Sequence, residues 1–160
     1  MHSSTEAKAD LLTSVGPILN YLDTHGSWPS AEALRSAFPI DGPLLSELRT
    51  KVLAGLDAGW LTPRAANGVK FGRLAKSTPQ SLGFTIDAVD MCGPGPGHIH
   101  PEGEFDLCFA LTPEARFDGH PEGWVVYPPG SWHVPTVSGG RMVILYFLPS
   151  GAIRFQPAPD

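Results

Sequence analysis

GPGPGHIHPEGEFDL, residues 93–107, and GWVVYPPGSWHVP, residues 123–135, are the two stretches that decide how this chain of 160 residues folds. Both place β-rich residues between glycine and proline turn signals, which is typical of short antiparallel strands. On an extended strand His98 and His100 differ by two positions, so their side chains point to the same face. His133 follows the PPG turn of the second stretch, and an antiparallel strand would bring it across from the other two. The sequence therefore predicts three imidazoles in one place.

Two glutamates follow the first pair of histidines. Glu102 and Glu104 keep the parity of that pair if the chain stays extended, but Pro101 and Gly103 can turn it so that either glutamate faces the imidazoles. Three imidazole nitrogens and one carboxylate oxygen, with open positions left over, suit one divalent transition metal. The residue types leave Fe, Mn, Zn, Co and Ni open as the ion.

The spacing of apolar residues differs between residues 1–67 and the chain from Gly68 onward. From Gly68 onward, short runs such as VKFGRLA and RMVILYFLP alternate with turns and favour a sandwich or barrel. Residues 1–67 instead carry apolar positions at three-to-four spacing, as helices do. We expect a mainly β protein, α+β overall, with a helical arm over residues 1–67 and one antiparallel β-barrel over residues 68–160.

The arm is expected to contain about three helices. The first covers residues 7–25, with Ser4 or Thr5 as its N-cap. A short second helix follows Ser30, and a third begins at Pro43, a residue favoured in the first helical turn. Between them they would present an apolar stripe to the β domain.

Charge is scarce and unevenly distributed. The net charge is -5, and residues 78–160 carry 3 Lys/Arg against 9 Asp/Glu. Nucleic acid and anionic membranes are therefore unfavourable partners. The apolar runs are too short to span a bilayer, and the first residues lack the apolar core of a signal peptide, so we expect a cytoplasmic protein. Cys92 and Cys108 are expected to be reduced and mostly buried.

The two stretches resemble the two motifs of the cupin superfamily, at spacings G-x4-H-x-H-x3-E and G-x4-P-x-G-x2-H. The first motif supplies two His and one Glu, and the second supplies the remaining His. The resemblance implies a small antiparallel barrel whose metal ligands are His98, His100, Glu104 and His133. The chain departs from the pattern at Val137, where the second motif often has Asn, and each block is one residue shorter after its leading glycine. Neither departure removes a ligand.

Among cupins, a single barrel behind a helical arm, with HIHPEGEFDLCFAL and GWVVYPPGSWHVPTV as its motifs, is similar to the small bacterial 4-hydroxylaminobenzoate lyase family. Members of that family convert 4-hydroxylaminobenzoate to protocatechuate with release of ammonia, in nitroaromatic degradation. The resemblance implies the same reaction, or one on a related aryl hydroxylamine. Glu102 is then a candidate acid or base beside Glu104, provided that burial favours its protonated form.

Trp132, Tyr127 and Arg141 are the candidates for the substrate pocket. Trp132 is adjacent to His133 in the sequence, and Arg141 is one of the few cations of the β domain that could hold a substrate carboxylate. The other basic candidates, among which the sequence does not choose, are Arg116, Arg154, Lys70 and Arg73. Further aromatic and apolar candidates, each more commonly a plain core residue, are Phe84, Ile86, Phe105, Leu107, Trp124 and Phe147.

Two other functions are compatible with the same pattern. An iron-dependent cupin dioxygenase on a small aromatic or thiol substrate uses a similar ligand set and would consume oxygen. A ligand-sensing regulator would bind DNA through its helices, yet no helix carries a basic stripe. The arm is more simply a lid over the barrel or a subunit contact, and we expect a homodimer or higher homo-oligomer. His120, in a polar turn, is expected to be a surface residue.

Overall fold

The structure is a computed structural model, and it describes residues 3–24 and 29–158. Within these ranges the helices are α1 (Ser4–Ser14), α2 (Gly16–Thr24), α3 (Ala31–Ala37) and α4 (Pro43–Ala58), with a short 3-10 helix η1 (Pro79–Ser81). The strands are β1 (Arg64–Ala66), β2 (Val69–Ala75), β3 (Phe84–Met91), β4 (His98–His100), β5 (Glu104–Ala110), β6 (Arg116–Phe117), β7 (Gly123–Tyr127), β8 (Ser131–His133), β9 (Val137–Ser138), β10 (Met142–Pro149) and β11 (Arg154–Phe155).

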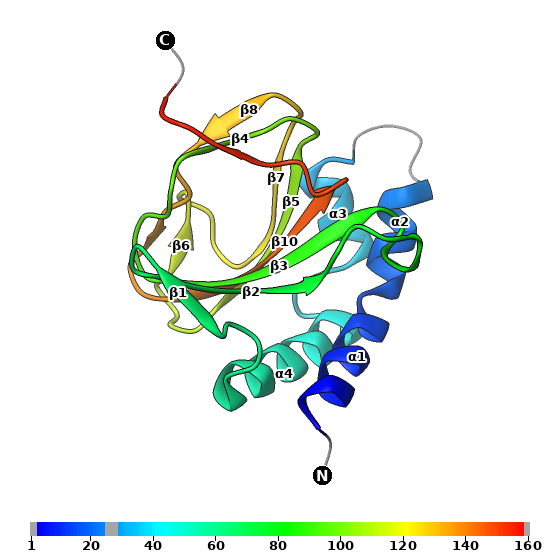
Figure 1. Cartoon of the computed structure of the whole chain (residues 1–160). Helices are drawn as coiled ribbons and strands as arrows, with labels where there is room; N and C mark the ends of the chain where they lie inside the picture. Colours follow the sequence, from blue (N-terminus) through cyan, green and yellow to red (C-terminus); the bar gives the residue numbers. More distant parts are fainter. Residues whose placement is uncertain (1–2, 25–28, 159–160) are drawn as a thin grey trace.

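The strands form antiparallel sheets. The largest has the order β1-β2-β3-β10-β5-β7, a second has the order β11-β4-β8, and a third pairs β6 with β9. In Figure 1 these sheets curve around a common interior, with β4 and β8 across from β3 and β10. The predicted mainly β fold with antiparallel strands is confirmed.

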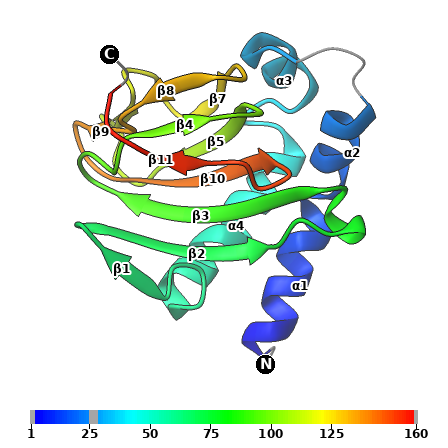
Figure 2. The same cartoon turned by 45° about the horizontal axis from the view of Figure 1, so that its top comes forward.

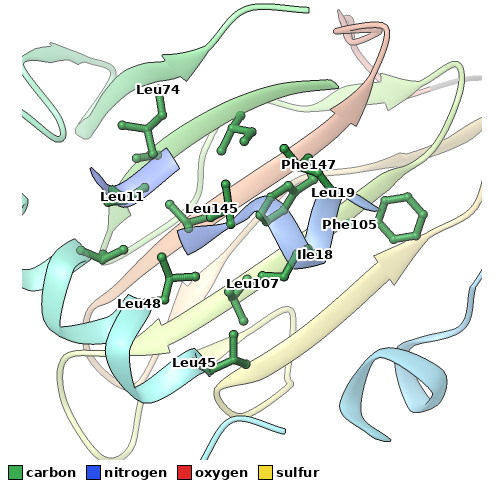
Figure 3. Close-up of a cluster of buried hydrophobic side chains, with 14 of the residues drawn as sticks. Leu11, Ile18, Leu19, Leu45, Leu48, Leu74, Phe105, Leu107, Leu145 and Phe147 are labelled. Carbon is green, nitrogen blue, oxygen red and sulfur yellow. The ribbon is translucent and has the colours of Figure 1, made fainter. Parts of the chain in front are cut away.

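The outer face of the six-stranded sheet packs against the helices. Leu107 of β5 and Leu145 of β10 lie in register with each other and belong to one buried apolar cluster with Leu11 and Leu48 of the helices. Figure 3 shows these side chains meeting between the helices and the strands. The arrangement in Figures 1 and 2 places α1, α2 and α4 on this outer side. The helices therefore build the core together with the sheet.

The inner face of the same sheet forms a second core. Side chains alternate along a strand, so Cys108, Ile144 and Tyr146 face away from the helices and join Phe117 and Val125 in a separate cluster. These residues fill one end of the interior. The other end is lined by polar side chains, which make up the site described below.

The expected first helix is interrupted. α1 ends at Ser14 and α2 begins at Gly16, so the described arm contains four helices instead of about three. Pro17 is the physical reason, because it has no N–H to donate to the carbonyl four residues earlier and its ring crowds that carbonyl. His25, the expected end of this helix, lies outside the described residues. The two later helices begin as predicted, with Ser30 capping α3 and Pro43 opening α4.

The N-cap of α1 is one residue earlier than predicted. The Ser3 hydroxyl accepts from the Glu6 backbone N–H, and the Glu6 carboxylate accepts from the Ser3 N–H, which completes a capping box. Ser4 and Thr5 lie inside the helix. Ser3 fits the position because its glutamate partner stands three residues later.

Other expectations concern exposure. Cys92 and Cys108 are both free thiols, and Cys108 is buried, but Cys92 is exposed, against the prediction. It follows the last residue of β3, where the chain leaves the sheet. His120 is exposed, as predicted. In the described part of the chain no helix combines the length and the hydropathy needed to cross a bilayer.

Candidate metal centre

His98, His100, Glu104 and His133 meet at the polar end of the interior. Their candidate ligand atoms all lie within 4.8 Å of one another, and Figure 1 shows the strands that carry them, β4, β5 and β8. The register of β4 with β8 places His98 opposite His133, while the turn after His100 brings Glu104 to the start of β5. His98, His100 and Glu104 are buried, and His133 is nearly so.

The Nδ1 atoms of the three histidines are held by acceptors outside the cluster. His98 Nδ1 lies 3.1 Å from the carbonyl oxygen of Pro96, which can only accept, so this nitrogen carries the proton. His100 Nδ1 lies 2.9 Å from the Ser131 hydroxyl, which itself donates to the Pro128 carbonyl and therefore accepts from the imidazole. In both rings Nε2 is thus the nitrogen that can offer a lone pair to the cluster.

The third imidazole is fixed in the same way by a carboxylate. His133 Nδ1 donates to Asp118 Oδ2 at 2.7 Å, which leaves His133 Nε2 facing the cluster. Asp118 also accepts from the Tyr127 hydroxyl and, through Oδ1, from the Thr136 N–H at 2.9 Å. Burial raises the pKa of Asp118, but these three bonds outweigh burial and lower the pKa below its ordinary value. An ionised acceptor behind a metal-binding histidine fixes its tautomer and increases its basicity.

When each ring carries only its Nδ1 proton, the atoms that face one another at the centre are all acceptors. His100 Nε2 lies 2.9 Å from Glu104 Oε2, and His98 Nε2 lies 3.2 Å from His133 Nε2. Burial opposes ionisation of Glu104, but the three imidazoles outweigh burial and hold the pKa of its carboxyl well below the ordinary value. His100 Nε2 and both Glu104 oxygens are buried without a hydrogen-bond partner. Lone pairs and a buried negative charge that converge in this way need a cation, so the donor set fits a divalent metal ion.

Asp106 is a further buried carboxyl beside this cluster. It follows Glu104 by two residues on β5, so it shares the inner face, and neither of its oxygens has a hydrogen-bond partner. Burial, and then the negative charge of Glu104, raise the pKa of Asp106 well above its ordinary value. Burial and the neighbouring charge therefore both favour the protonated form of this carboxyl.

The structure separates the two glutamates that the sequence left as alternatives. Glu104 is buried within the cluster, whereas Glu102 is exposed in the turn between β4 and β5. Pro101 and Gly103 form that turn, and Gly103 adopts a φ of 86°, in the left-handed region. The condition for Glu102 as an acid or base, burial, is not met.

The three residues predicted for the substrate pocket fall in three different places. Tyr127 lies beside the cluster, with its ring centroid 4.1 Å from that of His133 and 5.3 Å from that of His100. Trp132 lies opposite Ile99 in the β4–β8 register, so it points away from the histidine face, and its indole N–H donates to the Gln156 carbonyl. Trp132 is adjacent to His133 in sequence, but alternation along β8 places the two side chains on opposite faces.

Arg141 lies on the helix-facing side of the large sheet. Its guanidinium makes two bonds to Asp90, at 2.7 and 2.5 Å, and Asp90 is in register with Val143 of the outer core. It therefore does not share a face with the cluster. The same holds for the aromatic and apolar candidates, which the structure places in the helix-covered core: Phe84, Ile86, Phe105, Leu107, Trp124 and Phe147.

Sequence reasoning missed four residues that support the cluster. Ser131 and Asp118 orient histidines, Asp106 lies beside Glu104, and Phe155 of β11 approaches His98 with ring centroids 5.7 Å apart. Asp118 stands in an Asp-Gly pair, which predicts a tight turn between β-residues. Nothing local to that turn indicates that its carboxylate reaches a histidine 15 residues away.

Antiparallel sheets around a common interior, with two histidine strands paired beside a buried glutamate, give this protein a cupin-like fold. The crystal structure of the DMSP lyase DddQ from Ruegeria pomeroyi DSS-3 aligns with 97% of this chain and 99% of its own, with a TM-score of 0.54 and 16% identity. At that identity the likeness shows a shared fold.

A model of the 4-hydroxylaminobenzoate lyase family matches residues 24–155, and the chain belongs to this family. The 4-hydroxylaminobenzoate lyase of Nocardioides sp. (strain LMS-CY) is 30% identical over 162 residues, which cover 94% of this chain and 95% of that protein. The 4-hydroxylaminobenzoate lyase of Pseudomonas putida is 28% identical over 134 residues, or 72% of this chain and 76% of that protein. The predicted family and the predicted enzyme class, a lyase, are confirmed.

Proposed function

We propose that this chain is a metal-dependent lyase that converts 4-hydroxylaminobenzoate and water into protocatechuate and ammonia. The observation that carries the proposal is the convergence of three imidazole Nε2 lone pairs and the Glu104 carboxylate within 4.8 Å, in a member of a family named for this substrate. The atoms balance with one molecule of water and no oxidant, because the hydroxylamino oxygen and the water oxygen become the two ring hydroxyls.

The ligands would be His98, His100, Glu104 and His133, and they would leave a bound divalent ion with a net positive charge. When bound, such an ion supplies Lewis acidity toward the hydroxylamino oxygen and lowers the pKa of a water molecule. The Nδ1 contacts of the three histidines keep their Nε2 atoms directed at one point before substrate arrives. This preorganisation is the contribution of the chain itself.

Aromatic rings flank the cluster and would orient a flat substrate. Tyr127 packs against two of the histidines, and its hydroxyl is bonded to Asp118, so this ring is fixed. Phe155 contacts His98 but is 62% exposed, so its ring stands where the cluster meets solvent. A benzene ring held between such walls would keep its hydroxylamino group near the ligand atoms.

The test is an anaerobic assay of metal-loaded protein on 4-hydroxylaminobenzoate, following ammonia and protocatechuate. We expect equimolar products without oxygen. His133→Ala should lose metal and turnover together, whereas the matched variant His120→Ala, at an exposed histidine outside the cluster, should keep both. Turnover by metal-free protein would contradict the role of the ion, and a requirement for oxygen would favour the dioxygenase.

Four finer predictions accompany this proposal. They are the place of the reaction in nitroaromatic degradation, the assembly as a homodimer or higher homo-oligomer, the cytoplasmic location, and the division into residues 1–67 and 68–160. All four stay predictions. β1 begins at Arg64, before the predicted boundary, and the helices share a core with the sheet. Size-exclusion chromatography with light scattering measures the assembly directly.

A further inference from the structure

A carboxylated aromatic substrate needs a cationic side chain at a fixed distance from the reacting group. The structure narrows the choice among the basic residues of the β domain. Seven basic residues lie on or next to the strands: Arg64, Lys70, Arg73, Lys76, Arg116, Arg141 and Arg154. Lys76 directly follows β2 and lines a cavity with Leu12 and Leu19 of the helices, so it lies on the helix side. Alternation and register place Lys70 and Arg141 on the helix-facing side, since both neighbour Asp90. Arg154 is in register with Ile99, on the face of β4 away from the histidines, and Arg116 bonds to carbonyls of its own turn.

Arg73 is on the inner face. Its neighbours two and four residues earlier on β2, Phe71 and Val69, pack with the inner core, and its partner in register is Asp87 of β3. From there a row of polar side chains crosses the sheet, because Asp87 is in register with Tyr146 and Tyr146 with Asp106. The row runs from the half-exposed arginine to the buried carboxyl beside Glu104.

The guanidinium retains binding capacity toward a second carboxylate. Arg73 Nε donates to Asp87 Oδ1 at 2.8 Å and Nη2 donates to Asp87 Oδ2 at 3.4 Å, which occupies one edge of the planar group. The other edge, with Nη1 and the second Nη2 hydrogen, keeps the fork geometry that matches a carboxylate. Asp87 fixes the position of the arginine, so little side-chain entropy is lost on binding.

The spacing suits a para-substituted ring. Three strand intervals, about 14 Å in a flat sheet, separate β2 from β5, and the sheet curves around the interior (Figure 1). By alternation Arg73 and Glu104 lie on the same inner face of the sheet, at the two ends of this span, and the Arg73 side chain is 51% exposed. A benzene ring with a carboxylate and a hydroxylamino group at opposite positions can bridge what remains.

We propose that Arg73 binds the carboxylate of an aromatic acid whose opposite substituent lies at the metal cluster. This inference rests on the proposed function, which it deepens by assigning the group that selects a carboxylated substrate. Arg64 supplies the matched control. It is in register with Phe71, so it shares the inner face, but it stands on the edge strand β1, one strand further from the cluster.

The experiment compares the metal-loaded wild type with Arg73→Gln, Arg73→Lys and Arg64→Gln on 4-hydroxylaminobenzoate and on phenylhydroxylamine, which lacks the carboxylate. Arg73→Gln should raise KM for the acid roughly ten- to hundredfold, the usual worth of a charged hydrogen-bonded pair. KM for phenylhydroxylamine should not change. Arg73→Lys should recover part of the loss, and Arg64→Gln should stay near the wild type. An equal effect of Arg73→Gln on both substrates, or a larger effect of Arg64→Gln, would overturn the proposal.

A binding measurement separates this proposal from the proposed function. The unreactive acid 4-hydroxybenzoate and its uncharged counterpart phenol are titrated into the metal-loaded wild type, Arg73→Gln and the neutralised pair Arg73→Gln/Asp87→Asn. We expect both variants to weaken binding of the acid selectively. If the wild type binds the acid through Arg73 yet does not turn over 4-hydroxylaminobenzoate, the proposed function fails and the carboxylate site stands. Equal affinity of all three proteins for the acid overturns the carboxylate site.

Discussion

The two faces of the six-stranded sheet use the same strands for different purposes. On β5, Phe105, Leu107 and Phe109 face the helices, while Glu104 and Asp106 face the interior, in strict alternation. The outer face is apolar and is covered by the helices. The inner face carries buried carboxyls and histidines, and burying such groups costs free energy unless a hydrogen-bond partner or an opposite charge compensates them. A single residue of register shift would exchange the two sets, so the stability of the outer core is what holds the inner site in place.

The largest effect is expected from removing Glu104, the one carboxylate in the proposed ligand set. Glu104→Gln should reduce bound metal and lower turnover by three orders of magnitude or more, on the order of the several kcal/mol that a metal supplies to a transition state. Metal analysis after dialysis and steady-state kinetics measure both quantities. Glu114→Gln, at an exposed glutamate, is the matched control. Full activity of Glu104→Gln would show that the inner face does not act through this cluster.

A substitution that creates a cavity tests how much the outer face contributes to stability. Leu107→Ala should lower the free energy of unfolding by about 2–5 kcal/mol, because Leu107 is fully buried between sheet and helices. Denaturant unfolding of the metal-loaded protein measures this loss. The folded variant should still bind one metal ion per chain. Loss of metal from a variant that is still folded would mean that the two faces are not independent.

Two substitutions behind the histidines of the inner face are expected to weaken metal binding to different extents. Asp118→Asn should weaken metal binding about ten- to hundredfold, because the ionised acceptor that holds the His133 tautomer becomes neutral. Ser131→Ala removes a neutral acceptor from His100 and should weaken binding less. Competition with a chelator gives both affinities. The reverse ranking would contradict the assignment of Asp118 as the dominant support.

Metal binding should depend on pH through His133. Burial lowers the pKa of this histidine, but Asp118 and Glu104 outweigh burial and raise the pKa from 6.5 to about 8. In the metal-free protein the extra proton stabilises the fold below pH 6.5, and this contribution is lost as the pH rises to about 8. The ion must displace that proton, so affinity should increase about tenfold per pH unit up to about pH 8 and then level off. Calorimetric titrations at pH 6.5, 7.5 and 8.5 test this, and a flat profile would refute it.

The smallest effect is expected from an arginine outside the interior. Arg49 of α4 bonds to Glu122 and stacks over the Phe109 ring, so it ties the helix to the sheet. Arg49→Gln should lower the free energy of unfolding by about 1 kcal/mol, since both partners are partly exposed. KM should not change, in contrast to Arg73→Gln. A change in KM alone would show that α4 contributes to the site.

Local features were predictable because they depend on neighbours in the sequence. The strand parity of His98 and His100, the Ser30 cap and Pro43 at the start of α4 each follow from a few residues. The helix break at Pro17 was equally local and could have been predicted from its missing N–H. Adjacency in the sequence was misleading for Trp132. It is next to His133 in the chain, but alternation along β8 directs its side chain to the opposite face.

By itself, the sequence determined which residue types gather in the two histidine stretches and that alternating strands would carry them. Only the tertiary structure decided which of them meet. His133 faces His98 because β4 pairs with β8 in one register, and Asp118 reaches His133 because β6 pairs with β9. The choice of Glu104 over Glu102 depends on the turn between β4 and β5, and the proposed choice of Arg73 over Arg141 depends on which face of the large sheet the helices cover. That is set by long-range packing of apolar surface, which no local pattern encodes.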